Sequence, residues 1–260
     1  MVPTAPAASS APRELGQSAL PSVVPLDVEE PTGDYWRRRL AQHTGDWYAG
    51  LRLQKLPEDL RVYEHLLWAS APAAVVELGS HRGGSTLWFR DRLAALDRYQ
   101  PLATGPRRVV AVSEDTGPAR EGVSLRDPAW PASISFVDGD VRDPELPRQV
   151  AGLVPAGGSC LVVEDTAHQY DTTLAALLGF AGLVAPGGFF VVEDGVVDVP
   201  GLADGASAGG VLAAVDDWLA SEAGAPFRRR RDLELYGLTS SPQGWLQRTG
   251  AGPDAGDPAR

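Results

Sequence analysis

The feature that most constrains the fold is a set of short segments made almost wholly of apolar residues. Such segments form strands that are buried on both faces, as in parallel sheets covered by helices. Between them, apolar residues recur at helical spacing, as in the predicted helix that begins near Asp171. We therefore predict an α/β fold whose ligands bind at the carboxyl ends of the strands. The predicted strands are Ala74–Leu78, Arg108–Val112, Ile134–Val137, Cys160–Val163 and Phe189–Val192.

The predicted organisation is a single domain over residues 32–248, between two unstructured ends. Residues 1–31 contain six prolines, so we expect a disordered arm, and residues 249–260 are expected to form a flexible tail. The domain begins with a helical extension over residues 32–70, which holds one helix over Asp34–Trp47 and a second capped by Asp59. It ends in two strands, Phe227–Tyr236 and Gly244–Gln247, joined by a turn.

Composition excludes several classes of function. The formal net charge of −11 argues against binding to nucleic acid or to an anionic membrane. The single cysteine rules out an intrachain disulfide and a thiolate metal cluster. With no membrane-length apolar run and no secretory signal, we expect a cytoplasmic protein. Lys55 is the one lysine among 23 basic residues, and we attribute the excess of arginine to the codon usage of a GC-rich genome.

A glycine turn follows the first strand, in the pattern Glu-x-Gly-x-x-x-Gly-Gly-Ser that begins at Glu77. The spacing favours neither dinucleotide nor P-loop binding. A carboxylate before the first glycine would repel a pyrophosphate but suit a cationic ligand. The pattern resembles the cofactor loop of class I S-adenosylmethionine methyltransferases, although glycines that merely pack a strand-to-helix turn would look similar. The cofactor-binding residues that this resemblance implies here are Glu77, Gly79, Ser80, Gly83, Gly84 and Ser85.

Further acidic residues follow the second and third strands. In such folds an acid after the second strand binds the ribose, and here Glu114 and Asp115 both qualify. The methyltransferases more often show Asp at the position of Ser113, so this is a departure, and we favour Glu114. The resemblance implies that Asp140, in Asp138-Gly139-Asp140, contacts the adenine. Each of these acids alone could equally belong to a solvated turn.

Two neighbouring strands both end in Glu-Asp, at Glu164-Asp165 and at Glu193-Asp194. Carboxylates crowded at adjacent strand ends repel unless they are protonated or neutralised by a cation. Oxygen ligands suit Mg²⁺, so Asp165, Glu193 and Asp194 are the predicted metal ligands. The alternative is that these acids cap the following helices and face water.

Four other features of the sequence could contribute to the expected site. His168 lies three residues beyond Asp165 and could accept a proton as general base, or be a surface histidine. Lys55 could close over the site from the N-terminal side. The glycine-rich segment Asp198–Gly210 could form a lid or a surface insertion. The run Arg228–Arg231 could hold an anionic sugar nucleotide or belong to an exposed edge strand.

Taken together, the motifs resemble the cephalosporin hydroxylase and rhamnosyl O-methyltransferase family. The motifs that carry this resemblance are Trp47-Tyr48-x-Gly50, Lys55-x-Pro57-x-Asp59 with Tyr63, the glycine turn from Glu77 to Ser85, Asp165-x-Ala167-His168, Glu193-Asp194 and Pro242-x-Gly244-Trp245-Leu246. The resemblance covers roughly residues 34–248. It implies a Rossmann-like class I methyltransferase with a mostly parallel seven-stranded sheet, helices on both faces and an antiparallel C-terminal hairpin.

The same resemblance implies the activity. We expect a homo-oligomeric sugar O-methyltransferase of antibiotic biosynthesis that uses S-adenosylmethionine, and Mg²⁺ held by Asp165, Glu193 and Asp194. A substrate such as nucleotide-linked rhamnose would bind the metal, and Asp165 or His168 would remove a proton. Hydroxylation is the rival within the family, but the chain lacks the His-x-Asp/Glu spacing of non-haem iron sites. Outside the family, the sequence also allows a cofactor-binding protein without chemistry or a metal-dependent hydrolase.

Overall fold

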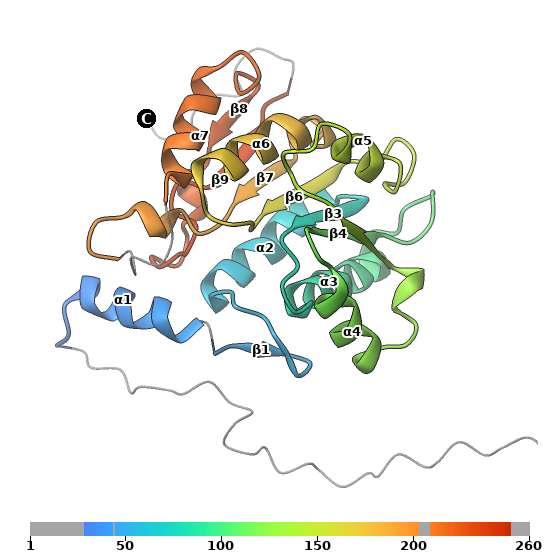
Figure 1. Cartoon of the computed structure of the whole chain (residues 1–260), viewed down its shortest axis with the longest axis horizontal. Coiled ribbons are helices and arrows are strands. Elements are labelled where there is room, and N and C mark those ends of the chain that lie inside the picture. The colour runs from blue at the N-terminus through green and yellow to red at the C-terminus, as the bar shows by residue number, and fades with distance from the viewer. Residues whose placement is uncertain (1–28, 44, 203–208, 251–260) are drawn as a thin grey trace, which may run out of the picture.

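The computed structural model describes residues 29–43, 45–202 and 209–250. The predicted arm over residues 1–31 and the predicted tail over residues 249–260 therefore lie almost wholly outside the described residues, as do residues 203–208 of the predicted lid. A seven-stranded sheet in the order β5-β4-β3-β6-β7-β9-β8 forms the centre of the fold (Figure 1). Its first five strands are parallel, and β9 is antiparallel to both of its neighbours. The predicted sheet and its C-terminal hairpin are confirmed.

The described elements alternate along the chain in the expected way. The strands of the main sheet are β3 (Ala74–Leu78), β4 (Arg108–Ser113), β5 (Ile134–Asp138), β6 (Cys160–Glu164), β7 (Phe189–Val192), β8 (Phe227–Arg229) and β9 (Trp245–Arg248), and a small hairpin pairs β1 (Trp47–Tyr48) with β2 (Leu51–Arg52). The α-helices are α1 (Thr32–His43), α2 (Pro57–Ser70), α3 (Gly84–Tyr99), α4 (Gly117–Arg126), α5 (Leu146–Ala151), α6 (Tyr170–Phe180) and α7 (Val211–Ala220). Short 3₁₀ helices include η4 (Gly195–Asp198) and η5 (Arg231–Leu233).

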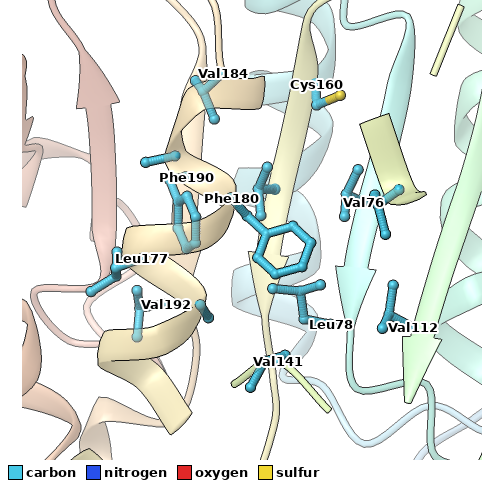
Figure 2. Packing of buried hydrophobic residues seen from close by; sticks show 14 of the residues in the cluster. Val76, Leu78, Val112, Val141, Cys160, Leu177, Phe180, Val184, Phe190 and Val192 are labelled. Atoms are coloured by element: carbon cyan, nitrogen blue, oxygen red, sulfur yellow. The ribbon is translucent and has the colours of Figure 1, made fainter. Parts of the chain in front are cut away.

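Helices cover the sheet on both faces, because successive side chains of each buried strand point to opposite sides. In β3, Val76 and Leu78 pack toward α5, α6 and α7, whereas Val75 packs toward α2 and α3. Figure 2 shows the first of these layers, with Leu177 and Phe180 of α6 lying over the strands. The apolar composition of the strands is thus explained by burial on both sides.

The order of the strands creates a crevice beside β3. From β3 the chain passes to β4 and then to β5 at the edge of the sheet, and it returns to place β6 on the other side of β3. Parallel α/β sheets bind ligands where the strand order reverses in this way, outside the carboxyl ends of the strands. Backbone pairing continues into this region, since the N–H of Gly79 donates to Val112 O at 2.8 Å and that of Asp165 to Leu78 O at 2.8 Å.

Three local predictions were wrong. The N-terminal helix ends at His43, and Trp47, expected as a helical anchor, lies in β1, where Asp46 Oδ1 accepts its N–H at 2.8 Å. The second helix begins at Pro57, so Asp59 does not cap it. Its carboxylate instead accepts the N–H of Ser240 at 2.8 Å and its hydroxyl at 3.0 Å.

The third wrong prediction concerns the C-terminal hairpin. Its first strand was predicted over Phe227–Tyr236, but β8 ends at Arg229. There Arg230 turns back to pair with Asp232 at 2.6 Å, and the chain enters η5. Alternation of charged and apolar side chains predicted a longer strand than the partner strand β9 can pair, because β9 has only four residues.

Gly79 holds the first turn of the crevice, and we predict that Gly79→Ala strongly destabilises the protein. Its φ is +103°, and an added Cβ would lie 1.8 Å from Asp165 O. Gly157 is a matched control, because its φ is +71° but no atom lies near its Cβ position. Backbone strain alone should cost Gly157→Ala about 1–2 kcal/mol, whereas Gly79→Ala should lose more than about 3 kcal/mol. Urea unfolding measures both, and equal losses would contradict the crowding at Gly79.

Asp59 generates a second prediction about stability. Burial raises its pKa to about 6, against the hydrogen bonds from Thr239 and Ser240, which lower it. The folded state thus keeps a proton that the unfolded state releases near pH 3.8, and stability falls as the pH rises through this window. Asp59→Asn removes the effect, so between pH 4 and pH 7 it should gain about 2 kcal/mol relative to the wild type. Urea unfolding at both pH values, with the exposed Glu121→Gln as control, tests this; a constant difference would contradict it.

Candidate active site

One cavity of about 910 Å³ opens at the carboxyl ends of β3, β4, β6 and β7. Sequence analysis nominated residues on all of these strand ends and on the loop after β5, and most of them meet in this cavity. The nominated residues that line it are Gly79, Ser80, Ser85, Glu114, Asp140, Asp165, His168 and Asp194. The nominated residues that are buried but do not line it are Glu77, Gly83, Gly84 and Glu193.

The glycine turn allows a close approach of backbone segments. Gly79 faces the carbonyl of Asp165, and Gly84, at the start of α3, would place a Cβ only 2.0 Å from Arg52 O. Gly83 has φ +82° at the end of the turn. The glycines therefore allow the turn to pack against β2 and β6. This is the alternative role that the sequence analysis considered for them. The same packing brings Gly79, Ser80 and Ser85 to the cavity wall, so packing and cofactor binding do not conflict.

Glu77 lies at the inner end of β3, below the cavity. Its side chain is fully buried and accepts a hydrogen bond from the hydroxyl of Thr86. Burial raises its pKa to about 7, although the nearby charge of Lys55 lowers it. Glu77 is therefore close to the boundary between its charged and neutral forms at neutral pH.

The ends of β4 and β5 form an acidic rim. Ser113 Oγ accepts the N–H of Ser80 at 2.9 Å, which ties the glycine turn to β4. Arg142 pairs with Asp140 at 2.6 Å and with Glu114 at 3.8 Å, and its hydrogen bonds hold the pKa of Asp140 below its usual range. Asp115, the other ribose candidate, accepts the N–H of Gly117 at 2.8 Å and is absent from the cavity wall. The geometry thus favours Glu114.

Lys55 occupies the centre of the acidic cluster at the ends of β6 and β7. Its side chain is 2% exposed, and its Nζ donates to Asp165 Oδ2 at 2.9 Å and to Glu193 Oε2. Tyr63 donates to the other oxygen, Glu193 Oε1. Sequence reasoning placed Lys55 above the site, whereas the structure places it beneath, as a buried partner of two carboxylates. No local signal marked this contact, because 110 and 138 residues separate the partners.

These contacts move the pKa values of the cluster in opposite directions. Burial alone would lower the pKa of Lys55, but the charges of Asp165, Glu193 and Glu77 outweigh it and raise it. Burial would raise the pKa of Asp165, but Lys55 holds it below its usual range. Burial dominates at Glu193 and raises its pKa well above the ordinary value.

Asp165, His168 and Asp194 form the group that faces the cavity. One ligand atom from each lies within 4.8 Å of the others, and His168 Nε2 is 3.2 Å from Asp194 Oδ2. His168 Nδ1 is buried with no hydrogen-bond partner among the described residues. Two carboxylates and one imidazole suit a divalent cation. The structure thus groups His168, rather than Glu193, with the two predicted ligands.

Strained backbone is concentrated around the cavity. Four residues that line it have a positive φ although they are not glycine: Gln54 (54°), His81 (38°), His168 (54°) and Asp194 (53°). Such conformations cost about 1–3 kcal/mol each and cluster at functional sites, where the surrounding structure imposes them. His168 and Asp194 are thus held in place by the backbone as well as by their mutual contact.

The far wall of the cavity comes from α1 and η4, which sequence analysis did not assign to the site, together with Leu202 of the possible lid segment Asp198–Gly210. Leu40 of α1 and Val196 of η4 pack together, and Arg37 Nε donates to Gly201 O at 2.6 Å. These segments close the cavity opposite the glycine turn with a mostly apolar surface. The run Arg228–Arg231, for which an anionic substrate or an exposed edge strand was expected, does not line the cavity, and its first two residues lie in the edge strand β8. Arg229 pairs instead with Asp216.

Comparison of the sequence with known proteins gives consistent relatives. Rhamnosyl O-methyltransferase from Mycobacterium bovis (strain BCG / Pasteur 1173P2) is 25% identical over 209 residues, which cover 77% of each chain. The enzyme of the same name from Mycobacterium leprae (strain TN) is 26% identical over 156 residues, covering 58% of this chain and 61% of that protein.

Comparison of the structure agrees with the sequence. An apo-structure of CmcI superimposes with a TM-score of 0.55 and 21% identity, covering 95% of this chain and 89% of CmcI. A CmcI structure described as "Mg-SAM" gives a TM-score of 0.55 and 18% identity, covering 94% and 89%. This likeness confirms the predicted class I methyltransferase fold. Residues 41–249 match the family model described as "Rhamnosyl O-methyltransferase/CmcI", and the chain therefore belongs to this family.

Proposed function

We propose that the protein is an S-adenosylmethionine- and Mg²⁺-dependent O-methyltransferase that acts on a hydroxyl group of a deoxysugar, such as nucleotide-linked rhamnose, in the biosynthesis of a natural product such as an antibiotic. The observation that carries the proposal is a single cavity that joins the glycine turn after β3 to Asp165, His168 and Asp194. Family membership supports the enzyme class, and the relatives named rhamnosyl O-methyltransferase support a sugar acceptor. The CmcI structure described with Mg and SAM agrees with both expected cofactors.

The proposed cofactor half of the cavity lies over the glycine turn. Gly79, Ser80 and Ser85 line this wall of the cavity. We assign Glu114 to the ribose hydroxyls and Asp140 to the adenine. The family resemblance also assigns Glu77, Gly83 and Gly84 to this half, where their buried positions shape the turn from below.

The proposed metal ligands are the two predicted carboxylates that face the cavity, Asp165 and Asp194, grouped there with His168. Glu193, predicted as the third ligand, lies behind them, where Lys55 and Tyr63 donate to its two oxygens. A divalent ion bound there would lower the pKa of a coordinated sugar hydroxyl. Of the two base candidates, we favour His168, because Lys55 holds the pKa of Asp165 low and so makes that carboxylate a weak base. With its proton on the buried Nδ1, His168 would receive the sugar proton at Nε2, which lies 3.2 Å from Asp194 Oδ2. Asp194 would then stabilise the imidazolium by its charge.

Hydroxylation is the rival activity within the family, and the donor set argues against it. Non-haem iron oxygenases use two histidines and one carboxylate, whereas the group found here contains two carboxylates and His168. A metal-dependent hydrolase would use a similar donor set. It would have no need, however, for the glycine turn that shares the cavity.

We propose that the protein is cytoplasmic and that it forms a homo-oligomer. In the parts of the chain that the structure describes, no helix has the length and apolar character needed to cross a membrane. Partly exposed aromatic residues in the N-terminal segment, such as Trp36 and Trp47, are the proposed contact between subunits.

Calorimetry tests the proposed function directly. We expect S-adenosylmethionine to bind with similar affinity with and without EDTA, because none of the residues assigned to the cofactor is a proposed metal ligand. Methyl transfer to nucleotide-linked rhamnose or a glycosylated natural product should require Mg²⁺ and stop with EDTA. Absence of cofactor binding would overturn the proposal and favour a hydrolase. Binding without transfer to any sugar acceptor would favour a protein without this chemistry.

Two aspartates that line the same cavity should give opposite kinetic signatures. Asp165→Asn should lower kcat by about a hundredfold or more, because it disturbs the metal and the base, and leave the dissociation constant of S-adenosylmethionine near the wild-type value. Asp140→Asn should instead weaken cofactor binding. Initial rates at saturating cofactor, together with calorimetry, separate the two effects. If Asp165→Asn changed only cofactor affinity, the role assigned to Asp165 would be wrong.

A further inference from the structure

We propose that Lys55 is a fixed cation of the catalytic centre. As a positioning residue, it partly balances the charges of Asp165 and Glu193 and so restricts the exchangeable metal to the ligands that face the cavity. The inference rests on the proposed function and adds to it a role for the chain's one lysine. Three independent observations carry it: the choice of residue, the contacts of its ammonium group, and the distribution of charge around it.

The choice of residue is informative because the chain uses arginine everywhere else. Of 23 basic residues, Lys55 alone is lysine. Codon usage explains why arginine predominates, but it does not explain why one lysine is retained at the most buried cationic position of the site. An ammonium is a compact point charge, whereas a guanidinium is a planar fork that needs more space. A position that is 2% exposed between two carboxylates fits the smaller group.

The contacts of Lys55 separate the inner acids from the outer ones. Its Nζ holds Glu193 Oε2, and Tyr63 holds Glu193 Oε1, so both oxygens of Glu193 are engaged by the protein. Asp165 accepts from Lys55 through Oδ2 and also belongs to the group of residues that faces the cavity. Asp194 contacts His168 at the cavity. The ammonium group therefore lies behind the carboxylates, and the cavity lies in front of them.

The charges explain why such a cation is needed. Asp165, Glu193 and Glu77 all act electrostatically on Lys55, and Asp59 and Asp194 lie close enough to influence each other. Without a cation, the cluster of carboxylates would be strongly repulsive. Part of the neutralising charge that the sequence analysis assigned to a divalent cation is therefore present in the protein itself. Lys55 supplies a permanent part of the positive charge. When the metal dissociates, the carboxylates therefore repel one another less strongly than they would without Lys55.

The test is the Mg²⁺ affinity of Lys55→Met, measured by calorimetry with Mg²⁺ alone. Removing the ammonium leaves an additional uncompensated negative charge a few ångströms from the ligands, so Mg²⁺ should bind about tenfold or more tighter. Saturating Mg²⁺ should also raise the Tm of this variant by more than it raises that of the wild type. Tyr63→Phe is the matched control, because it removes a contact with Glu193 without changing the charge. Its Mg²⁺ affinity should stay near the wild-type value.

Lys55→Arg keeps the inference testable if Lys55→Met does not fold. This variant retains the charge but not the shape, so Mg²⁺ affinity should remain near that of the wild type while kcat falls. Full turnover in Lys55→Arg would overturn the requirement for a compact ammonium. Unchanged or weaker Mg²⁺ binding by folded Lys55→Met would overturn the role of its charge.

Titration of each variant and of the wild type with S-adenosylmethionine separates this inference from the proposed function. If the wild type binds neither the cofactor nor Mg²⁺, the proposed function fails. If the wild type binds both and Lys55→Met responds to Mg²⁺ no more strongly than the wild type, only the role of Lys55 fails.

Discussion

The buried contact between Lys55 and the carboxylates of Asp165 and Glu193 is the interaction on which the architecture of the site depends. Strands β6 and β7 lie side by side and end together, so their acidic residues occupy one small volume. A parallel sheet offers no means of separating them, because the register that buries the apolar side chains also sets the positions of the strand ends. One ammonium group, brought from the connection between β2 and α2, makes this arrangement compatible with a folded protein. It also ties the N-terminal extension to the centre of the sheet.

Sequence predicted the core of the fold well, because the strands are short, apolar and separated by amphipathic helices. The acids at the strand ends were predicted for the same reason, since parallel strands direct their carboxyl ends to one edge. Prediction failed where the determining contact is distant in sequence. Asp59 resembled a helix cap, and only its contact with Ser240, 181 residues away, shows its structural role. The helices α4 and α5 went unpredicted because each is short and offers few apolar positions, although Pro118 and Pro147 mark their first turns.

The site was predicted in outline but not in its internal arrangement. Strand ends identified Asp165, Glu193 and Asp194 as neighbours, yet they could not show that Glu193 is turned toward Lys55 and Tyr63 while His168 joins the other two. That distinction depends on side-chain direction and on a left-handed backbone at His168 and Asp194, neither of which periodicity reveals. The wall formed by α1 also escaped prediction, because an amphipathic helix near a chain end gives no sign of what it covers.

The origin of the two cavity walls has an evolutionary consequence. One wall is built from turns that follow core strands, where a change of length or residue would disturb the sheet itself. The other is built from α1 and η4, which contribute no strand and meet through a few apolar side chains and the contact between Arg37 and Gly201. Mutations can therefore accumulate in this second wall and reshape the space it encloses while the opposite wall stays constant. A lineage with this architecture can diversify the molecules it accepts without reinventing its chemistry.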